Sequence, residues 1–164
     1  MIRVRPATAL DVPAVLPMVQ AICALHEAWD VDRYGMLADV VERYARWLPE
    51  RAVDPRSVFL VAEGGSADGG GLAGFLVGTC EENIPIYRVK EFGFIHDVWV
   101  DERFRRQGVA AALTEAAVER FRAIGVVQVR LETARANESA RSLFESCGFR
   151  IGAIDMLKHV GPRE

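Results

Sequence analysis

Apolar and polar residues follow two different periods along this chain, and the changes of period divide it into strands and helices. Apolar–polar alternation, or a short unbroken apolar run, predicts a β-strand. Apolar residues three and four positions apart predict an amphipathic helix. On this basis strands are expected at residues 2–5, 58–62, 72–79, 92–100, 126–131, 149–151 and 153–160, and helices at 10–28, 36–48, 109–124 and 138–147.

Capping and breaking residues refine the helix boundaries. Thr8, with Asp11 three positions later, is typical of a capping box before the first helix. Pro17 lacks a backbone donor and is expected to bend that helix, and the second helix should end near Pro49. Gly125 is a typical stop signal for the helix that precedes it.

A glycine-rich stretch, GGSADGGG, separates two of the predicted strands at residues 64–71. Glycine is entropically costly to order and offers no side chain to pack, so we expect a mobile hairpin loop. A phosphate-binding loop is the alternative, but the stretch lacks a terminal Gly-Lys-Ser/Thr and no helix follows it. Residues 81–91 are expected to form a second, irregular connection.

The order of these elements predicts a mixed α/β sheet rather than a regular βαβ repeat. The chain has 164 residues, of which 51% are hydrophobic, and this is enough for one sizeable core. We therefore expect a single domain over residues 1–164.

Charge and cysteine content narrow the class of protein. A net charge of −3 argues against a general nucleic-acid binder. Cys23, Cys80 and Cys147 are odd in number and widely separated, which argues against a disulfide framework or a metal site. The first residues lack the apolar segment of a signal peptide, and no run approaches the roughly 18 apolar residues of a membrane span. We expect a soluble, cytoplasmic protein without nucleic-acid or membrane partners.

The stretch WVDERFRRQGVAAA, residues 99–112, combines the end of an apolar strand, a basic turn and the start of a small-residue helix. A glycine at such a junction lets several backbone N–H groups point toward one place, and the helix N-terminus adds a positive partial charge. Arg105 and Arg106 add guanidinium groups that bind phosphate oxygens. The stretch indicates an anion site, although a glycine that merely packs the helix against the strand remains an alternative.

Two spaced motifs make the ligand more specific. Residues 105–110, RRQGVA, have the pattern Arg/Gln-x-x-Gly-x-Gly/Ala, and residues 137–149 follow one helix and one strand later as N-x-x-A-x-x-L-F-x-x-x-G-F. Together they resemble the acetyl-CoA-binding motifs of the GNAT superfamily of N-acetyltransferases. The order of the earlier elements is also similar, so the resemblance extends over nearly the whole chain.

The resemblance implies a mixed, mostly antiparallel sheet of six to seven strands, flanked by about four helices and splayed at its central strands. It also implies acetyl-CoA as cofactor, with the pyrophosphate on the glycine turn and the pantetheine arm beside the preceding strand. The residues that it places at the cofactor are Val98, Trp99, Val100, Arg105, Arg106, Gln107, Gly108, Val109, Ala110, Asn137, Ala140 and Phe144. Asn137 is equally consistent with a simple helix N-cap.

His96 is the candidate general base. An alkylamine is protonated at neutral pH, so acetyl transfer to it needs a route for proton removal, and imidazole titrates in that range. His96 lies two residues before Val98, a spacing that resembles the histidine of arylalkylamine acetyltransferases. A buried structural histidine is the alternative. In a regular strand Asp97 points to the opposite face, whereas a bulge would change which side chain enters the cleft, where Asp97 could orient the base or contact the acceptor.

Phe144 departs from the pattern of the family. Many members carry a tyrosine there, whose hydroxyl protonates the leaving thiolate, and phenylalanine has no hydroxyl. Tyr34, Tyr87 or water could replace it. Cys147 is expected in the core.

Trp29, Asp30, Tyr34 and Tyr87 fall in connections expected to border the acceptor cleft, where acidic groups would suit a cationic amine. We expect acetyl-CoA-dependent transfer to a primary amine, of a small molecule rather than a protein tail, directly within a ternary complex. A non-catalytic acyl-CoA-binding regulatory module is the alternative, because of Phe144. Dimers are common in the family, so a homodimer is one expected assembly.

Overall fold

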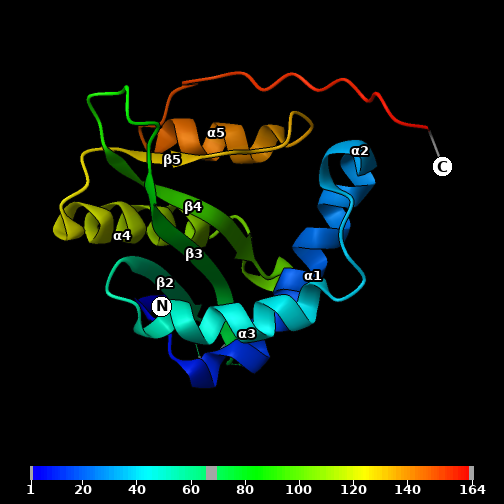
Figure 1. The fold of residues 1–164 in the computed structure, drawn as a ribbon. Helices are drawn as coiled ribbons and strands as arrows, with labels where there is room; N and C mark the ends of the chain where they lie inside the picture. The colour runs from blue at the N-terminus through cyan, green and yellow to red at the C-terminus, as the bar shows by residue number, and fades with distance from the viewer. Residues whose placement is uncertain (1, 66–69, 163–164) are drawn as a thin grey trace.

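The computed structural model describes residues 2–65 and 70–162, and in these residues five strands form one sheet in chain order (Figure 1). The strands are β1 (Arg3–Pro6), β2 (Ser57–Glu63), β3 (Leu72–Glu82), β4 (Glu91–Val100) and β5 (Val129–Leu131). The first four pair antiparallel, and β5 is parallel to β4. The mixed, mostly antiparallel sheet expected from the sequence is confirmed.

The pairing of β4 with β5 is short. Only residues 93–95 of β4 pair with β5, and their partners are Val129–Leu131. Residues 96–100 of β4 therefore lack a strand neighbour on the β5 side among the described residues. This opening beyond Ile95, called the wedge below, is a splay between β4 and β5, which are the last two strands of the described sheet rather than its central strands.

Helices cover both faces of the sheet. They are α1 (Val12–Trp29), α2 (Val31–Tyr34), α3 (Val40–Val53), α4 (Val109–Ile124) and α5 (Glu138–Ser146), with short 3-10 turns η1 (Ala9–Asp11) and η3 (Glu102–Phe104). On one face Leu113, Ala117 and Phe121 of α4 are fully buried against the sheet. On the other face Val15 and Val19 of α1 pack with Leu48 of α3.

Helix α1 follows the capping box predicted from Thr8 and Asp11, which is present at η1. Pro17 lies inside the helix without ending it. Residues 9–29 are long and apolar enough to cross a membrane, contrary to the expectation that no segment approaches this length. The apolar stripe of α1 nevertheless packs on the sheet, because Val12, Val15 and Val19 are buried there.

Two further sequence predictions are wrong. Helix α3 begins at Val40 and continues through Pro49 to Val53, because the fully buried Leu48 anchors this part of the helix on the core. The strands predicted at 149–151 and 153–160 are absent from the described residues, so the sheet has five strands rather than six or seven. Instead, residues 150–162 run as an exposed coil past α5 toward α2 (Figure 1).

Ion pairs tie this C-terminal coil to α2. Arg33 Nε lies 3.1 Å from Asp155 Oδ2, and its Nη2 lies 3.2 Å from Glu132 Oε2 beyond β5. His159 Nδ1 lies 3.8 Å from Asp32 Oδ1. These contacts lie between exposed groups, so they contribute little to stability.

The predicted glycine-rich connection joins β2 and β3. The N–H of Gly64 donates to the carbonyl of Gly71 at 2.9 Å, which closes a hairpin. Residues 66–69, at its centre, lie outside the described residues, so the expected mobility is not addressed.

Candidate active site

Strand β4 contains a bulge at His96. Asp97 pairs with Val77 of β3 and Ile95 pairs with Gly78, so His96 is an additional residue between them. Its imidazole contacts the ring of Trp47 of α3, and the carboxylate of Asp97 accepts a hydrogen bond from Tyr44 of the same helix. The two consecutive side chains therefore lie on one face, and the regular-strand expectation of opposite faces does not hold.

The bulge also turns the backbone that follows it. Asp101 N donates to Ala73 O at 2.9 Å, which makes it a hydrogen-bonded position opposite β3. Because such positions alternate in an antiparallel pair, the N–H and C=O groups of Val98 and Val100 point away from β3. They point toward the wedge, where β5 no longer pairs.

A turn of positive φ angles leads from η3 into α4. Arg106 has φ +61° and Gly108 has φ +79°, and α4 begins at the following residue, Val109. Throughout residues 2–65 and 70–162, no protein acceptor is found for the backbone N–H groups of residues 106–111. Six consecutive free donors at a helix N-terminus form an anion cradle.

The side chains of the turn have separate roles. The guanidinium of Arg105 lies 5.0 Å from the ring centre of Trp99, and its Nε donates to the carbonyl of Val100 at 3.2 Å. Gln107 donates to the carbonyl of Arg103. The exposed Arg106 makes no ion pair in the described part of the chain. Thus Arg105 is bound to the end of β4, whereas Arg106 is available to bind an anion.

His96 belongs to a hydrogen-bonded row of side chains. Its Nε2 lies 2.6 Å from Thr79 Oγ1 and 3.7 Å from Glu81 Oε1, and Thr79 Oγ1 donates to Glu81 Oε1 at 2.5 Å. The His96 side chain is 30% exposed. Burial lowers the pKa of His96 below its ordinary value of 6.5, so the imidazole is mostly neutral at pH 7.

Asp97 is the buried acid of the site. Its carboxylate accepts from the Tyr44 hydroxyl at 2.8 Å. Burial raises the pKa of Asp97, and the Tyr44 hydrogen bond opposes that rise. Burial raises the pKa of the nearby Cys23 thiol to about 11, with Asp97 adding to the shift, so this thiol stays protonated near neutral pH.

Helix α5 confirms one of the two readings of Asn137. Its Oδ1 accepts from the backbone N–H of Ala140 at 3.2 Å, so Asn137 is the N-cap. Its Nδ2 is not used in the described contacts and can still donate to a ligand. Phe144 is 9% exposed and packs edge-on against Phe149, 5.8 Å between ring centres.

The predicted acceptor residues are brought together only in part. Trp29 and Tyr34 both pack on His26, at 5.4 and 5.0 Å between ring centres, and Asp30 caps α2 between them. Tyr87 is 51% exposed and belongs to the connection between β3 and β4. In Figure 1 this connection lies on the opposite side of the molecule from α2. Tyr87 thus lies apart from the other three.

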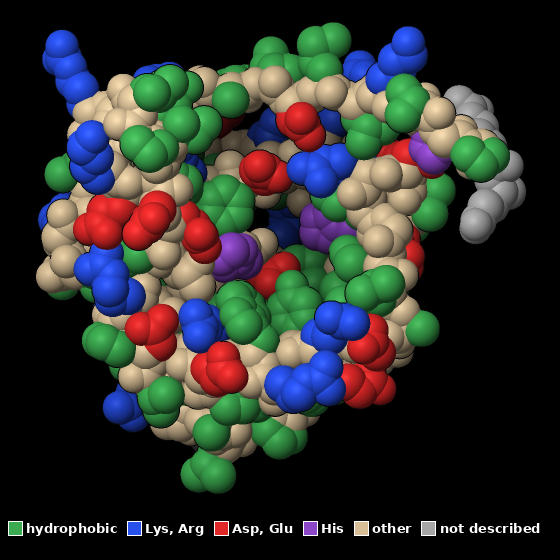
Figure 2. All heavy atoms as spheres, viewed as in Figure 1, with side chains coloured by type: hydrophobic (Ala, Val, Ile, Leu, Met, Phe, Trp, Pro, Cys, Tyr) green, Lys and Arg blue, Asp and Glu red, His purple; other side chains and the backbone are tan. Residues whose placement is uncertain are grey.

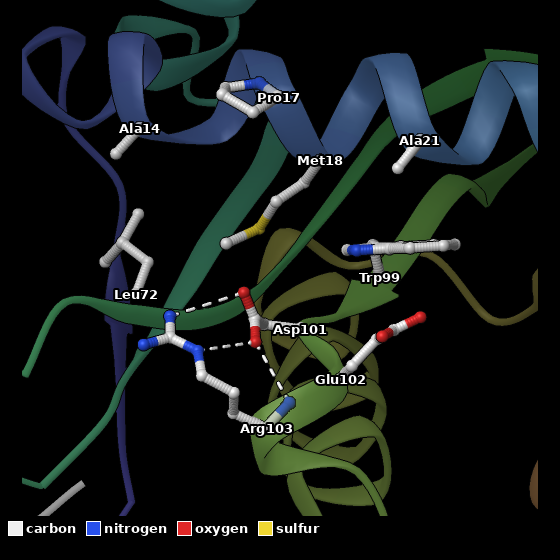
Figure 3. A pocket seen from close by; sticks show the side chains of 9 residues that line it. All are labelled: Ala14, Pro17, Met18, Ala21, Leu72, Trp99, Asp101, Glu102 and Arg103. Carbon is white, nitrogen blue, oxygen red and sulfur yellow. Dashed lines mark hydrogen bonds and ion pairs between the residues drawn. The ribbon is translucent and has the colours of Figure 1, made fainter. Parts of the chain in front are cut away.

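A hollow opens at the centre of the face seen in Figure 2. Histidine, acidic and hydrophobic side chains lie around it, with arginine or lysine side chains at its rim. A second cavity, of about 540 Å³, lies between α1 and the end of β4 (Figure 3). It is lined by Met18, Trp99 and the ion pair of Asp101 with Arg103, and His96 is not part of it.

Sequence reasoning missed Thr79, Glu81 and Tyr44. Thr79 lies at the end of a predicted strand and Tyr44 on a predicted helix, but no local pattern indicates which partner they face. Only the register of β3 against β4 and the packing of α3 bring them to His96 and Asp97.

Solved structures share this architecture. A mutant of the BH1408 protein from Bacillus halodurans superposes with a TM-score of 0.81 at 19% identity, over 96% of this chain and 99% of that chain. A predicted acetyltransferase from Clostridium acetobutylicum, solved with acetyl-CoA, superposes with a TM-score of 0.74 at 14% identity, over 98% of this chain and 96% of that chain. At these identities the likeness is one of fold.

The sequence defines the family. The model of the acetyltransferase (GNAT) family matches residues 22–149, and the chain belongs to that family. N-acetyltransferase 8 from Homo sapiens is 35% identical over 75 residues, which are 46% of this chain and 33% of that protein. The matched region thus spans about a third of the length of that relative.

Proposed function

We propose that this protein transfers the acetyl group of acetyl-CoA to a primary amine of a small molecule, directly within a ternary complex. The six N–H groups at residues 106–111, which lack a protein acceptor within the described residues and lie beside the wedge, carry the proposal. Membership of the acetyltransferase family supports the acetyl donor, as does the acetyl-CoA bound by the Clostridium relative of the same fold.

The residues present fit the donor. The free N–H groups and Arg106 would bind the pyrophosphate, and Gly108 leaves its place open, since a Cβ built there meets no protein atom within 4 Å. The main-chain groups of Val98 and the free amide of Asn137 would pair with the amides of the pantetheine arm. When bound, acetyl-CoA supplies a thioester whose carbonyl carbon accepts the amine.

His96 would then perform the proton step. The imidazole takes one proton from the ammonium form of the acceptor, which frees the nitrogen lone pair. The nitrogen forms its bond to the carbonyl carbon as the carbon–sulfur bond breaks, and the second amine proton ends on the sulfur, through water. His96 returns its proton to solvent.

The test is release of free CoA thiol from acetyl-CoA with a panel of small primary amines, polyamines and peptides. We expect turnover with at least one small amine, and His96→Ala should lower kcat/KM about 100-fold. His159→Ala, on the C-terminal coil, is the matched control and should leave turnover unchanged.

The second function, a non-catalytic acyl-CoA-binding module, is favoured by one observation. Phe144, where many family members carry a tyrosine, packs against Phe149 and has no hydroxyl to protonate a thiolate. Acetyl-CoA binding without thiol release for any amine would support this module and contradict catalysis.

A further inference from the structure

Thr79 and Glu81 of β3 form a row with His96 that extends from the interior to the surface. Thr79 is 7% exposed, and the Glu81 side chain is 45% exposed. The contacts are 2.6 Å between His96 Nε2 and Thr79 Oγ1, and 2.5 Å between Thr79 Oγ1 and Glu81 Oε1. Both are short enough to be strong hydrogen bonds.

The number of protons available to His96, Thr79 and Glu81 determines which group donates in each hydrogen bond. An ionised carboxylate only accepts, so the single hydroxyl proton of Thr79 is committed to Glu81. The Thr79 oxygen must then accept from His96, which requires a proton on Nε2. In the neutral imidazole Nδ1 consequently carries the lone pair, and it has no partner in the described part of the chain.

We propose that Thr79 and Glu81 are positioning residues that hold His96 as the Nε2–H tautomer, so that Nδ1 receives the proton of the acceptor amine. This inference rests on the proposed function for its catalytic meaning, but the tautomer itself is independent of turnover. The proton moves from the ammonium nitrogen to Nδ1, and the hydrogen bond from Nε2 to Thr79 strengthens as the ring becomes positive.

The surroundings of the ring support this role. Trp47 and Phe94 contact the imidazole edge-on, at 5.5 and 5.0 Å between ring centres, and limit its rotation. Glu81 from β3 and Asp97 from β4 favour the imidazolium, whereas burial and Arg51 from α3 oppose it. Glu81 is therefore the negative charge at the Nε2 side of the ring.

The first experiment reads the tautomer by nitrogen NMR of the imidazoles. We expect His96, assigned by the signals lost in His96→Ala, to be protonated at Nε2 in the neutral form. Thr79→Val keeps the shape but lacks the hydroxyl, and should give a mixture of tautomers. Thr79→Ser restores the hydroxyl and should restore the Nε2–H form. A wild-type protein protonated at Nδ1 would overturn the proposal.

The second experiment reads catalysis. Thr79→Val should lower kcat/KM about tenfold, a fraction of what a general base supplies, with Thr79→Ser close to wild type. In the His96→Ala background Thr79→Val should have no further effect. An equal tenfold loss in that background would show a structural role and contradict the proposal.

Glu81→Gln tests the charge without disturbing the interior. Removing the carboxylate destabilises the imidazolium, so the acidic limb of the pH–rate profile should move to lower pH by about 0.5 unit. Glu82→Gln removes an equal charge from the next residue of the same strand and should leave the limb in place. If the acidic limb of the pH–rate profile does not move in Glu81→Gln, the proposed role of Glu81 is contradicted. If no amine is turned over, the proposed function fails, while the NMR result still decides the tautomer.

Discussion

His96 and Asp97 are consecutive residues of one strand, and yet their side chains both contact helix α3. The additional residue at the bulge produces this arrangement, because it reverses which face of the sheet each later side chain of β4 points to. A neutral imidazole and a buried carboxyl are thereby placed side by side, each with its own hydroxyl partner, Thr79 and Tyr44.

Tyr44→Phe should destabilise the protein in a pH-dependent way. The change removes the hydrogen bond to the buried Asp97 and should cost about 1–3 kcal/mol in the free energy of unfolding. Because that bond lowers the pKa of Asp97, its loss raises the folded-state pKa further above the unfolded value. A raised carboxyl pKa makes stability fall as pH rises through it, so the cost should be larger at pH 8 than at pH 4.

Urea unfolding at the two pH values measures this cost. Tyr34→Phe is the control, because its hydroxyl has no hydrogen bond within the described residues, and should change stability by less than about 0.5 kcal/mol. A Tyr44→Phe cost that is the same at both pH values would show that Asp97 is not the linked group.

The pH dependence of turnover should reflect the lowered pKa of His96. The base must be neutral, so kcat/KM should hold near pH 7 and fall as pH decreases through a value below 6.5. The profile of His96→Ala, measured with the same amine, should lack this limb. A limb that persists in the variant would assign the base to another group.

Gly108→Ala should separate cofactor binding from stability. The φ of +79° disfavours any side chain, so the variant should lose about 1 kcal/mol of folding stability. The new methyl group should also obstruct the anion cradle and weaken CoA binding at least tenfold, as measured by calorimetry. Gly125→Ala, at φ +104° on the other end of α4, should lose similar stability with CoA affinity intact. Equal loss of affinity in both variants would argue against the cradle.

Phe144→Tyr restores the hydroxyl that many family members carry. If thiolate protonation limits the rate, kcat at saturating acetyl-CoA should rise about tenfold, a modest share of a general-acid effect. Phe149→Tyr, on the ring that contacts Phe144, is the control for adding a hydroxyl to this packing and should not raise kcat. A kcat for Phe144→Tyr equal to wild type, with the melting temperature preserved, would place the acid elsewhere.

Much of the fold follows from local pattern. The strands around residues 58–62, 72–79 and 92–100 and the helix at 109–124 occur where apolar periodicity predicts them, because each buries that apolar face. The second helix is less well predicted, since a proline rule alone ignores the packing that holds the turn after Pro49.

The C-terminal coil is the clearest failure. Residues 153–160 are mostly apolar and are expected to finish the sheet, but strand formation depends on a neighbour as much as on propensity. Arg33 and Asp32 instead contact this segment beside α2. The candidate site shows the same limit, because Thr79 and Tyr44 become partners of His96 and Asp97 only through strand register and helix packing.

The short pairing of β4 with β5 has a thermodynamic consequence. The backbone groups of Val98 that face the wedge have no strand partner among the described residues. A ligand that forms hydrogen bonds with them would extend the sheet and stabilise the folded state. Such a ligand adds RT ln(1 + [L]/Kd) to folding stability, about 2.7 kcal/mol at 100 times its Kd. Under the proposed function, the amount of folded protein would therefore follow the supply of acetyl-CoA.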